Sequence, residues 1–192
     1  MKLIFATTNS EKLIEAKMAL APFGFEVEGE SFPFKEPTEG TMESIARYKL
    51  SQIEDREEPV FVDDSGIFFE AYPNFPGILT KRIFNLVGYK GIEKLLKEEN
   101  RSAYFHGVIA MKWRNEIKVF HGELHGKITN LIPNDLPIDL KFPFDPIFIP
   151  NGYNKVLGEM PIEKRVFLSY RRIALEEMGK WLKNQLVVDK TS

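Results

Sequence analysis

Residues 3–12, Leu-Ile-Phe-Ala-Thr-Thr-Asn-Ser-Glu-Lys, decide how the fold begins. The first four are apolar and are typical of a short buried strand, and the next four are polar. The apolar residues that follow recur at helical spacing until Pro22, which ends the helix. Thr8, with Glu11 three residues later, matches a capping box and predicts a helix N-terminus at the polar turn. The chain therefore opens as strand, turn and helix.

Hydrophobic periodicity predicts further strands and helices along the rest of the chain. Gly88 separates two helical segments, Arg114 and Asn115 form a hairpin turn between two extended runs, and Ser169 is a suitable cap for the last helix. The order of elements indicates a mixed α/β domain. Strands are predicted at 25–28, 59–62, 103–113, 116–124 and 147–149, and helices at 42–53, 79–86, 92–96 and 173–186.

The composition excludes several classes of protein. The chain has 192 residues, of which 43% are hydrophobic, enough for one globular domain or two closely packed lobes. A net charge of -2 gives no broad attraction for nucleic acid or an anionic membrane. The absence of cysteine excludes disulfides and thiolate metal sites, which leaves hard oxygen ligands for a metal. No leader or membrane-spanning run is recognisable, so we expect a cytoplasmic protein.

The polar turn after the first strand is the first candidate site. Thr7, Thr8, Asn9 and Lys12 combine hydroxyl, amide and ammonium groups at a helix N-terminus, where backbone N–H groups also attract phosphate oxygens. Simple helix capping is the alternative interpretation. The glycine spacing of a Walker P-loop is missing.

An acidic pair follows the predicted strand at 59–62. In Asp63-Asp64-Ser65-Gly66 we expect the carboxylates to stand at the strand end, where a Ser-Gly turn lets backbone approach a ligand. One carboxylate can bind Mg²⁺, and either can orient or deprotonate a water molecule. A plain turn is the alternative. A magnesium site needs another oxygen ligand, and Glu36 or Glu39 in the preceding acidic loop can supply it.

Two further candidates lie in the C-terminal half. The segment Phe142-Pro143-Phe144-Asp145-Pro146 offers two aromatic rings that can stack on a purine and a carboxylate that can bond to it. Core packing is the usual alternative for such rings. Lys164, Arg171 and Arg172 form a basic group around a loop and a helix start, for which a solvated surface is the rival interpretation.

Taken in order, these segments resemble the inosine triphosphate pyrophosphatase family from the first strand to the C-terminal helix. No single motif carries the resemblance; the order and spacing do. Residues 7–12 match the family's Thr-Gly-Asn-x-x-Lys, residues 63–66 its Asp-Asp-Ser-Gly, and residues 76–77 its Pro-Gly. Residues 142–148 match its Phe-Gly-Tyr-Asp-Pro-Ile-Phe, and residues 163–171 match its Glu-Lys-Asn to Ser-His-Arg segment.

The resemblance implies a fold and a reaction. The fold is α/β and two-lobed, with an elongated mixed sheet flanked by helices, a nucleotide cleft between the lobes, and a single domain over residues 1–192. The reaction is attack of water on the α-phosphorus of an aberrant purine nucleoside triphosphate, such as ITP, dITP or XTP, which gives the monophosphate and pyrophosphate. The family also implies Mg²⁺ as cofactor and a homodimer.

Roles are implied residue by residue. Asp64 is the metal ligand and general base, Glu36 the second metal ligand, and Lys12 part of both the catalytic set and the triphosphate cradle. Charge cancellation and positioning suffice for such a reaction, so no covalent nucleophile is required. The remaining substrate contacts implied by position are Thr7, Thr8, Asn9, Ser65, Arg82, Phe142, Phe144, Asp145, Lys164, Tyr170 and Arg171.

The chain departs from the family at the base-binding end. Tyr170 stands where the family has His, and Pro143 replaces Gly and fixes φ. Donors such as the Arg171 guanidinium favour a 6-keto purine over adenine if they face the keto oxygen. Two alternatives remain: a pyrophosphatase for other modified nucleotides, as in the related Maf-like proteins, and a nucleotide-binding protein that has lost catalysis.

Overall fold

A computed structural model describes residues 1–114, 116–130, 132 and 142–188. In this part of the chain one mixed six-stranded sheet has the order β2-β1-β3-β4-β5-β6, with β1 parallel to β2 and β3, and β5 antiparallel to β6. None of its helices has the length and apolar character needed to cross a membrane. The strands are β1 (Lys2–Ala6), β2 (Glu26–Glu30), β3 (Val60–Phe69), β4 (Ser102–Trp113), β5 (Glu116–Ile128) and β6 (Phe148–Pro150). The helices are α1 (Ser10–Leu20), α2 (Met42–Ser51), α3 (Thr80–Leu95), α4 (Ile162–Leu168) and α5 (Tyr170–Val188), with short 3-10 turns η1 (Ala21–Phe23), η2 (Gly77–Leu79) and η3 (Leu157–Glu159).

The chain divides into two compact units. Unit 1 comprises Met1–Asp64, Gly107–Gly122 and Ser169–Ser192, and unit 2 comprises Ser65–His106 and Glu123–Leu168. Strands β3, β4 and β5 each contribute residues to both units.

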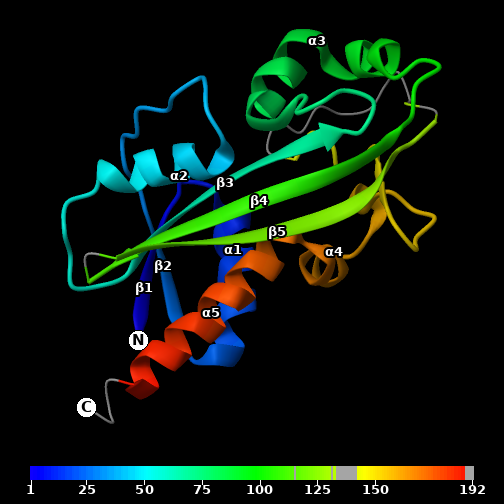
Figure 1. The fold of residues 1–192 in the computed structure, drawn as a ribbon. Helices are drawn as coiled ribbons and strands as arrows, with labels where there is room; N and C mark the ends of the chain where they lie inside the picture. The colour runs from blue at the N-terminus through cyan, green and yellow to red at the C-terminus, as the bar shows by residue number, and fades with distance from the viewer. Residues whose placement is uncertain (115, 131, 133–141, 189–192) are drawn as a thin grey trace. The chain divides into compact units, whose positions relative to one another are not determined.

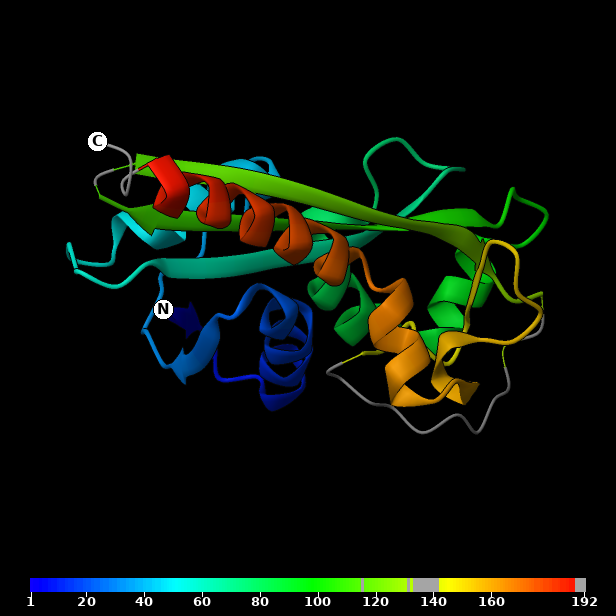
Figure 2. The same ribbon diagram turned by 90° about the horizontal axis from the view of Figure 1, so that it is seen from below.

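Unit 1 has helices on both faces of its part of the sheet. Figures 1 and 2 show α1 and α5 on one face, and α2 on the other. Side chains of β1, β3, β4 and β5 pack against α1 and α5 in one apolar cluster, within which the rings of Phe5 and Phe61 stack at 4.5 Å. Because successive side chains of a strand point to opposite faces, each strand here presents alternate residues to α5 and to α2.

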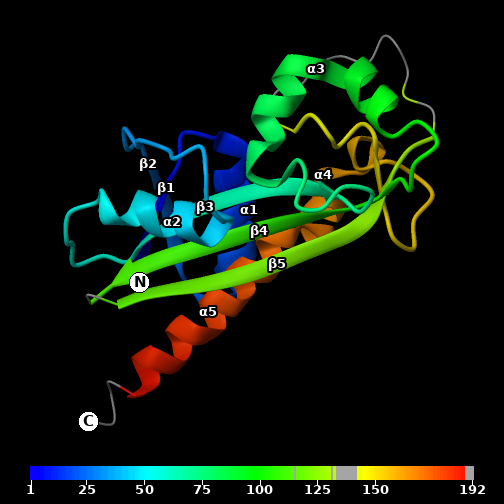
Figure 3. The same cartoon turned by 45° about the horizontal axis from the view of Figure 1, so that its top comes forward.

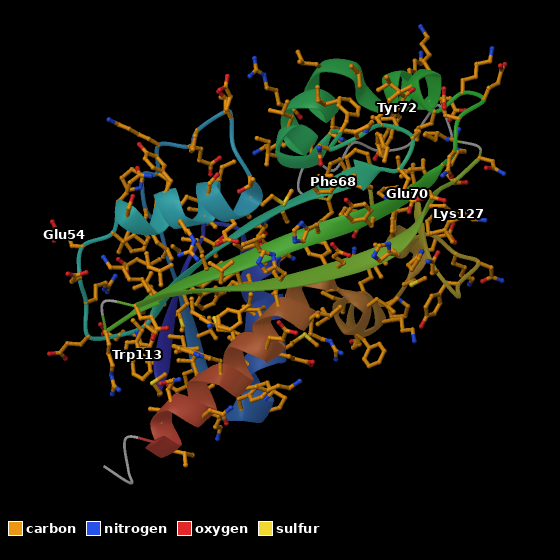
Figure 4. The ribbon with its side chains drawn as sticks, in the orientation of Figure 1. Glu54, Phe68, Glu70, Tyr72, Trp113 and Lys127 are labelled. Carbon is orange, nitrogen blue, oxygen red and sulfur yellow. The ribbon has the colours of Figure 1, made fainter. Side chains whose placement is uncertain are left out.

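Unit 2 has an aromatic core beneath helix α3. Phe144 contacts Phe69 and Phe84 with edge-to-face geometry, and all three rings are buried. Figure 3 shows α3 bent into two segments, where Gly88 adopts φ 59°. Figure 4 labels Phe68 on β3. Its ring stacks on that of Tyr104 with 5.1 Å between the ring centres.

Most of the predicted elements are confirmed. Helix α2 fills most of 42–53, Gly88 interrupts α3, and β4 and β5 flank the expected hairpin turn. In that turn Arg114 has φ 51°, as a tight turn requires, while Asn115 lies outside the described residues. Ser169 Oγ accepts a hydrogen bond from the backbone N–H of Arg171 at 3.1 Å and so caps α5.

The predicted capping box at the start of α1 is wrong. Asn9 is the N-cap: its Oδ1 accepts hydrogen bonds from the N–H groups of Glu11 and Lys12 at 3.0 and 3.2 Å. Thr8 lies one residue too early, and Thr7 Oγ1 accepts from the N–H of Asn9 instead. Asn caps a helix as well as Ser or Thr, so residue type alone did not fix the position.

The predicted turn at residues 63–66 is also wrong. Strand β3 runs without interruption through both carboxylates, Ser65 and Gly66. The two carboxylates stand in the middle of a strand, where residues of their type are normally depleted. Cations from other parts of the chain stabilise them there. Asp63 pairs with Lys12 and Arg171, and Asp64 pairs with Lys49.

Candidate active site

The first carboxylate of the pair is buried between two cations. Oδ2 of Asp63 lies 2.7 Å from Lys12 Nζ and 2.9 Å from Arg171 Nε. Burial alone would raise the pKa of Asp63, but the charges of Arg171 and Lys12 hold it well below its ordinary range. Asp63 is therefore ionised at neutral pH and ties α1 to the start of α5.

Arg171 is a buried hub rather than a surface cation. Its side chain is 1% exposed, and its three nitrogen atoms bond to Asp63, Glu15 and the Tyr170 hydroxyl. Burial lowers the pKa of Arg171, but the neighbouring Asp63, Tyr170 and Glu15 together outweigh this and leave the pKa raised. Ser169 Oγ also lies 3.3 Å from Glu15 Oε2, so Glu15 anchors both the N-cap residue Ser169 and Arg171 in the first turn of α5.

The second carboxylate belongs to a different cluster. Oδ1 of Asp64 lies 3.1 Å from Nζ of Lys49, a residue of α2, and the same nitrogen lies 3.0 Å from Oε1 of Glu36. Burial raises the pKa of Asp64 despite the opposing effect of Lys49. Burial lowers the pKa of Lys49, but Asp64 and Glu36 more than compensate, so the ammonium persists.

The strand pleat separates the two carboxylates. Asp63 and Asp64 are consecutive in β3, so their side chains leave opposite faces of the sheet. Asp63 meets the residues of α1 and α5, whereas Asp64 meets α2 and the acidic loop. Asp64 therefore shares a cation, the Lys49 ammonium, with Glu36.

An open pocket of about 250 Å³ lies within unit 1, at the end of β1 and the start of α1. Lys12 and Lys49 are among its lining residues, as are Glu36 and Asp63, whereas Glu39 and Asp64 are not. The rings of Phe32 and Phe34 stack at 5.7 Å on its wall. The full lining is Ala6, Thr7, Thr8, Lys12, Phe32, Phe34, Glu36, Lys49, Val62 and Asp63.

The predicted residues of unit 2 lie in varied surroundings. Asp145 pairs with Arg165 at 3.2 Å, and Lys164, on α4 rather than in a loop, has its ammonium 5.0 Å from the ring centre of Tyr153. Ser65 and Phe142 are half-buried, and Arg82 is exposed on α3.

Phe144 does not suit its predicted place beside the purine. Its side chain is 1% exposed and packs in the core of unit 2 against Phe69 and Phe84. A ring enclosed in this way has no face available to a base, so the core interpretation applies to Phe144. Of the two aromatic candidates only Phe142 retains exposure.

Sequence reasoning missed Lys49 and Glu15 as site residues. Lys49 lies on the apolar side of α2 between the buried residues Ala46 and Leu50. A lysine on a buried helix face requires a carboxylate partner, and this was the available signal. Glu15 carried no comparable signal, because carboxylates are common on the polar face of a helix.

The chain is similar to known proteins over almost its whole length. The sequence model of the Ham1 family matches residues 3–181. The dITP/XTP pyrophosphatase of Thermococcus kodakarensis is 39% identical over 97% of this chain and 100% of its own, and that of Methanopyrus kandleri is 38% identical over 97% and 98%. The structure of the Staphylococcus aureus Ham1 protein superposes with a TM-score of 0.75 at 27% identity, covering 96% of this chain and 100% of that one. The chain belongs to the Ham1 family.

Proposed function

We propose that this protein is a dITP/XTP pyrophosphatase, which hydrolyses aberrant purine nucleoside triphosphates to the monophosphate and pyrophosphate. The observation that carries the proposal is similarity over almost the entire chain to relatives that bear this name. The pocket of unit 1 supports it independently, because it combines two ammonium groups, two carboxylates and a helix N-terminus. A homodimer, as the resemblance implies, is part of the same proposal.

The carboxylates of Glu36 and Asp64, which meet at the Lys49 ammonium, fit a magnesium ion. Glu36 and Asp64 already direct one oxygen each at a single cation, the Lys49 ammonium. No group of three or more acidic, His or Cys residues suited to a metal occurs in the described part of the chain. The pair formed by Glu36 and Asp64 suits Mg²⁺, which commonly binds through one or two carboxylates and takes its other ligands from water and substrate phosphates. Bound by Glu36 and Asp64, Mg²⁺ would cancel phosphate charge and acidify a water molecule.

The protein's own groups provide the rest of the chemistry. Lys12 and the backbone N–H groups at the start of α1 bind the triphosphate oxygens. A water oxygen bonds to the α-phosphorus, the bond from that phosphorus to the bridging oxygen breaks, and pyrophosphate leaves. Asp64 accepts the proton of the attacking water. Asp63 acts differently, because its Oδ2 pairs with two cations and so holds Lys12 in place.

The substrate contacts beyond this pocket are proposed by position in the family. Arg171 is buried and acts through the residues that it bonds, Asp63 and Tyr170. Phe144 lies in the core of unit 2 and supports the loop that carries Phe142. The proposed contacts with substrate are Thr7, Thr8, Asn9, Ser65, Arg82, Phe142, Asp145, Lys164 and Tyr170.

Removing the ammonium of Lys49 should slow the reaction. Without it, Glu36 and Asp64 repel each other and lose the cation that holds them together, so we expect Lys49→Met to lower kcat/KM by about tenfold to a hundredfold. Lys49→Arg keeps the charge and should retain more activity. Steady-state pyrophosphate release measures both, and an unchanged kcat/KM in Lys49→Met would remove Lys49 from the site.

The substrate class can be tested with purified protein and Mg²⁺. We expect pyrophosphate to be released from dITP and XTP at least about tenfold faster than from ATP, because donors placed for a keto oxygen are left unpaired by an amino group. Equal rates for all purines would contradict the proposed specificity. Nucleotide binding without any turnover would instead support a protein that has lost catalysis.

A further inference from the structure

The loop that carries Glu36 is bonded to the end of α2. Gln52, the C-cap residue of this helix, bonds to both polar groups of the Lys35 backbone. Its Oε1 accepts a hydrogen bond from the Lys35 N–H at 2.9 Å, and its Nε2 donates to the Lys35 carbonyl at 3.0 Å. Nε2 also donates to the carbonyl of Tyr48 within α2 at 3.2 Å. One side-chain amide, with its acceptor and two donors, therefore ties Lys35 to the helix.

The next loop residue, Glu36, is held by the same helix through its side chain. Oε1 of Glu36 lies 3.0 Å from Nζ of Lys49, which also lies 3.1 Å from Oδ1 of Asp64. Lys49 precedes Gln52 by three positions, and residues with this spacing are neighbours on a helix surface. Two consecutive loop residues are thus bonded to neighbouring positions of α2, one by its backbone and the other by its carboxylate.

The contact with Lys49 alone orients Glu36 weakly. The side chain of Glu36 is 62% exposed, whereas that of Asp64 is 19% exposed. Asp64 is fixed by its strand and its burial, but little packing restrains Glu36. An ion pair to an exposed carboxylate contributes little, because water screens the attraction and side-chain entropy opposes it. The backbone bonds at Lys35 therefore limit where the Glu36 carboxylate can lie.

The two ends of the loop are anchored separately. Glu30, the last residue of β2, pairs with Arg56 at 2.8 Å, and Thr41 caps the start of α2. Gln52 holds the loop between these ends, at the residue that precedes Glu36. Loss of the Gln52 amide should therefore release Glu36 while both ends of the loop stay in place.

We propose that Gln52 is a positioning residue for the metal site: it bonds Lys35 to α2 and so holds Glu36 where its carboxylate can bind a divalent cation together with Asp64. This inference rests on the proposed function, in which Glu36 is a metal ligand. Gln52 acts through the loop, so it sets the fraction of molecules in which Glu36 is in place. A site that is competent in only a fraction of the molecules has an affinity lowered by that fraction.

The test compares Gln52→Met with Ser51→Ala. Methionine keeps the length of the side chain but makes none of the three bonds of the Gln52 amide. Ser51 is a matched control, because its Oγ donates to the same Tyr48 carbonyl at 2.8 Å and that bond stays within the helix. The probe is Mn²⁺, which binds the same oxygen ligands as Mg²⁺, and the free ion is measured by electron paramagnetic resonance without substrate. We expect Gln52→Met to raise the Kd for Mn²⁺ by about threefold to tenfold, and Ser51→Ala to leave it unchanged.

A double-mutant cycle with Glu36→Ala tests the route of the effect. In the Glu36→Ala background, Gln52→Met should cause no further rise in the Kd, because the carboxylate that it positions is absent. In the metal-free protein, the Lys35 amide should exchange its hydrogen faster in Gln52→Met than in Ser51→Ala. An unchanged Kd in Gln52→Met, an equal rise in both backgrounds, or wild-type exchange at Lys35 would overturn the inference.

The kinetic signature also separates positioning from chemistry. Gln52→Met should raise the Mg²⁺ concentration that gives half the maximal rate, and should change kcat at saturating Mg²⁺ by less than about twofold. A loss of kcat that persists at saturating Mg²⁺ would contradict a positioning role.

Failure of the proposed function gives a different result. If the wild-type protein hydrolyses neither dITP nor XTP, the reaction is wrong, and the Kd for Mn²⁺ in the cycle still decides the role of Gln52. If Glu36→Ala does not weaken Mn²⁺ binding, Glu36 is not a ligand, and the inference about Gln52 is overturned even in an active enzyme.

Discussion

Replacing Asp64 with Asn is expected to lower kcat by roughly a hundredfold or more. The substitution keeps the size of the side chain but removes the charge that accepts the proton of the attacking water. It also removes one of the two carboxylates that converge on Lys49, which leaves Glu36 alone to face a cation. Initial rates of pyrophosphate release from dITP at saturating substrate measure the effect.

A matched control separates catalysis from a general change in charge. Asp55→Asn removes a carboxylate from the same unit. Oδ1 of Asp55 lies 2.6 Å from Nζ of Lys112, and neither residue lines the pocket. It should leave kcat unchanged. Turnover near the wild-type value in Asp64→Asn would place the chemistry on other residues, with Asp63 and Glu36 the first to be tested.

Asp63→Asn is expected to destabilise the fold by about 3 to 5 kcal/mol, since it leaves two cations without the carboxylate that they share. Asp63 is buried, and its oxygen lies within 2.9 Å of both Lys12 Nζ and Arg171 Nε. Urea unfolding gives the free energy of unfolding. Glu28→Gln, which breaks the exposed pair with Lys2, is the control and should have no measurable effect. An equally small effect in Asp63→Asn would mean that the buried pair does not stabilise the fold.

The loss of unfolding free energy caused by Asp63→Asn should depend on pH. The pKa of Asp63 is lowered in the folded state, so its contribution to stability is present above its unfolded pKa of about 3.9 and is lost as the pH falls towards the folded pKa. The difference in unfolding free energy between wild type and Asp63→Asn should therefore be constant near neutral pH and shrink below about pH 4. A difference that persists unchanged to pH 3 would contradict the assignment of this charge.

The sequence predicted local elements better than it predicted the partners of charged residues. The apolar spacing in residues 42–53 was sufficient for α2, and Gly88 was sufficient for the bend in α3, because both signals are local. The course of β3 was not predictable in this way. Two adjacent carboxylates favour a turn unless distant cations neutralise them, and Arg171 is 108 positions away from Asp63.

The same limit applies to the candidate site. Lys12 and Asp63, which are in direct contact, lie in motifs that the sequence shows, whereas Glu36, which shares their pocket, follows only from the resemblance. Lys49 fits the apolar pattern of the helix, and its sequence position does not show that its ammonium links Glu36 to Asp64. Phe144 shows the opposite case, since a motif of aromatic residues beside a carboxylate does not reveal which ring enters the core.

The products of dITP hydrolysis test the central claim most directly. With Mg²⁺ present, we expect equal amounts of dIMP and pyrophosphate, separated by anion-exchange chromatography. Release of dIDP and orthophosphate would show attack at a different phosphorus and would contradict the proposed reaction, as would binding of dITP without any product.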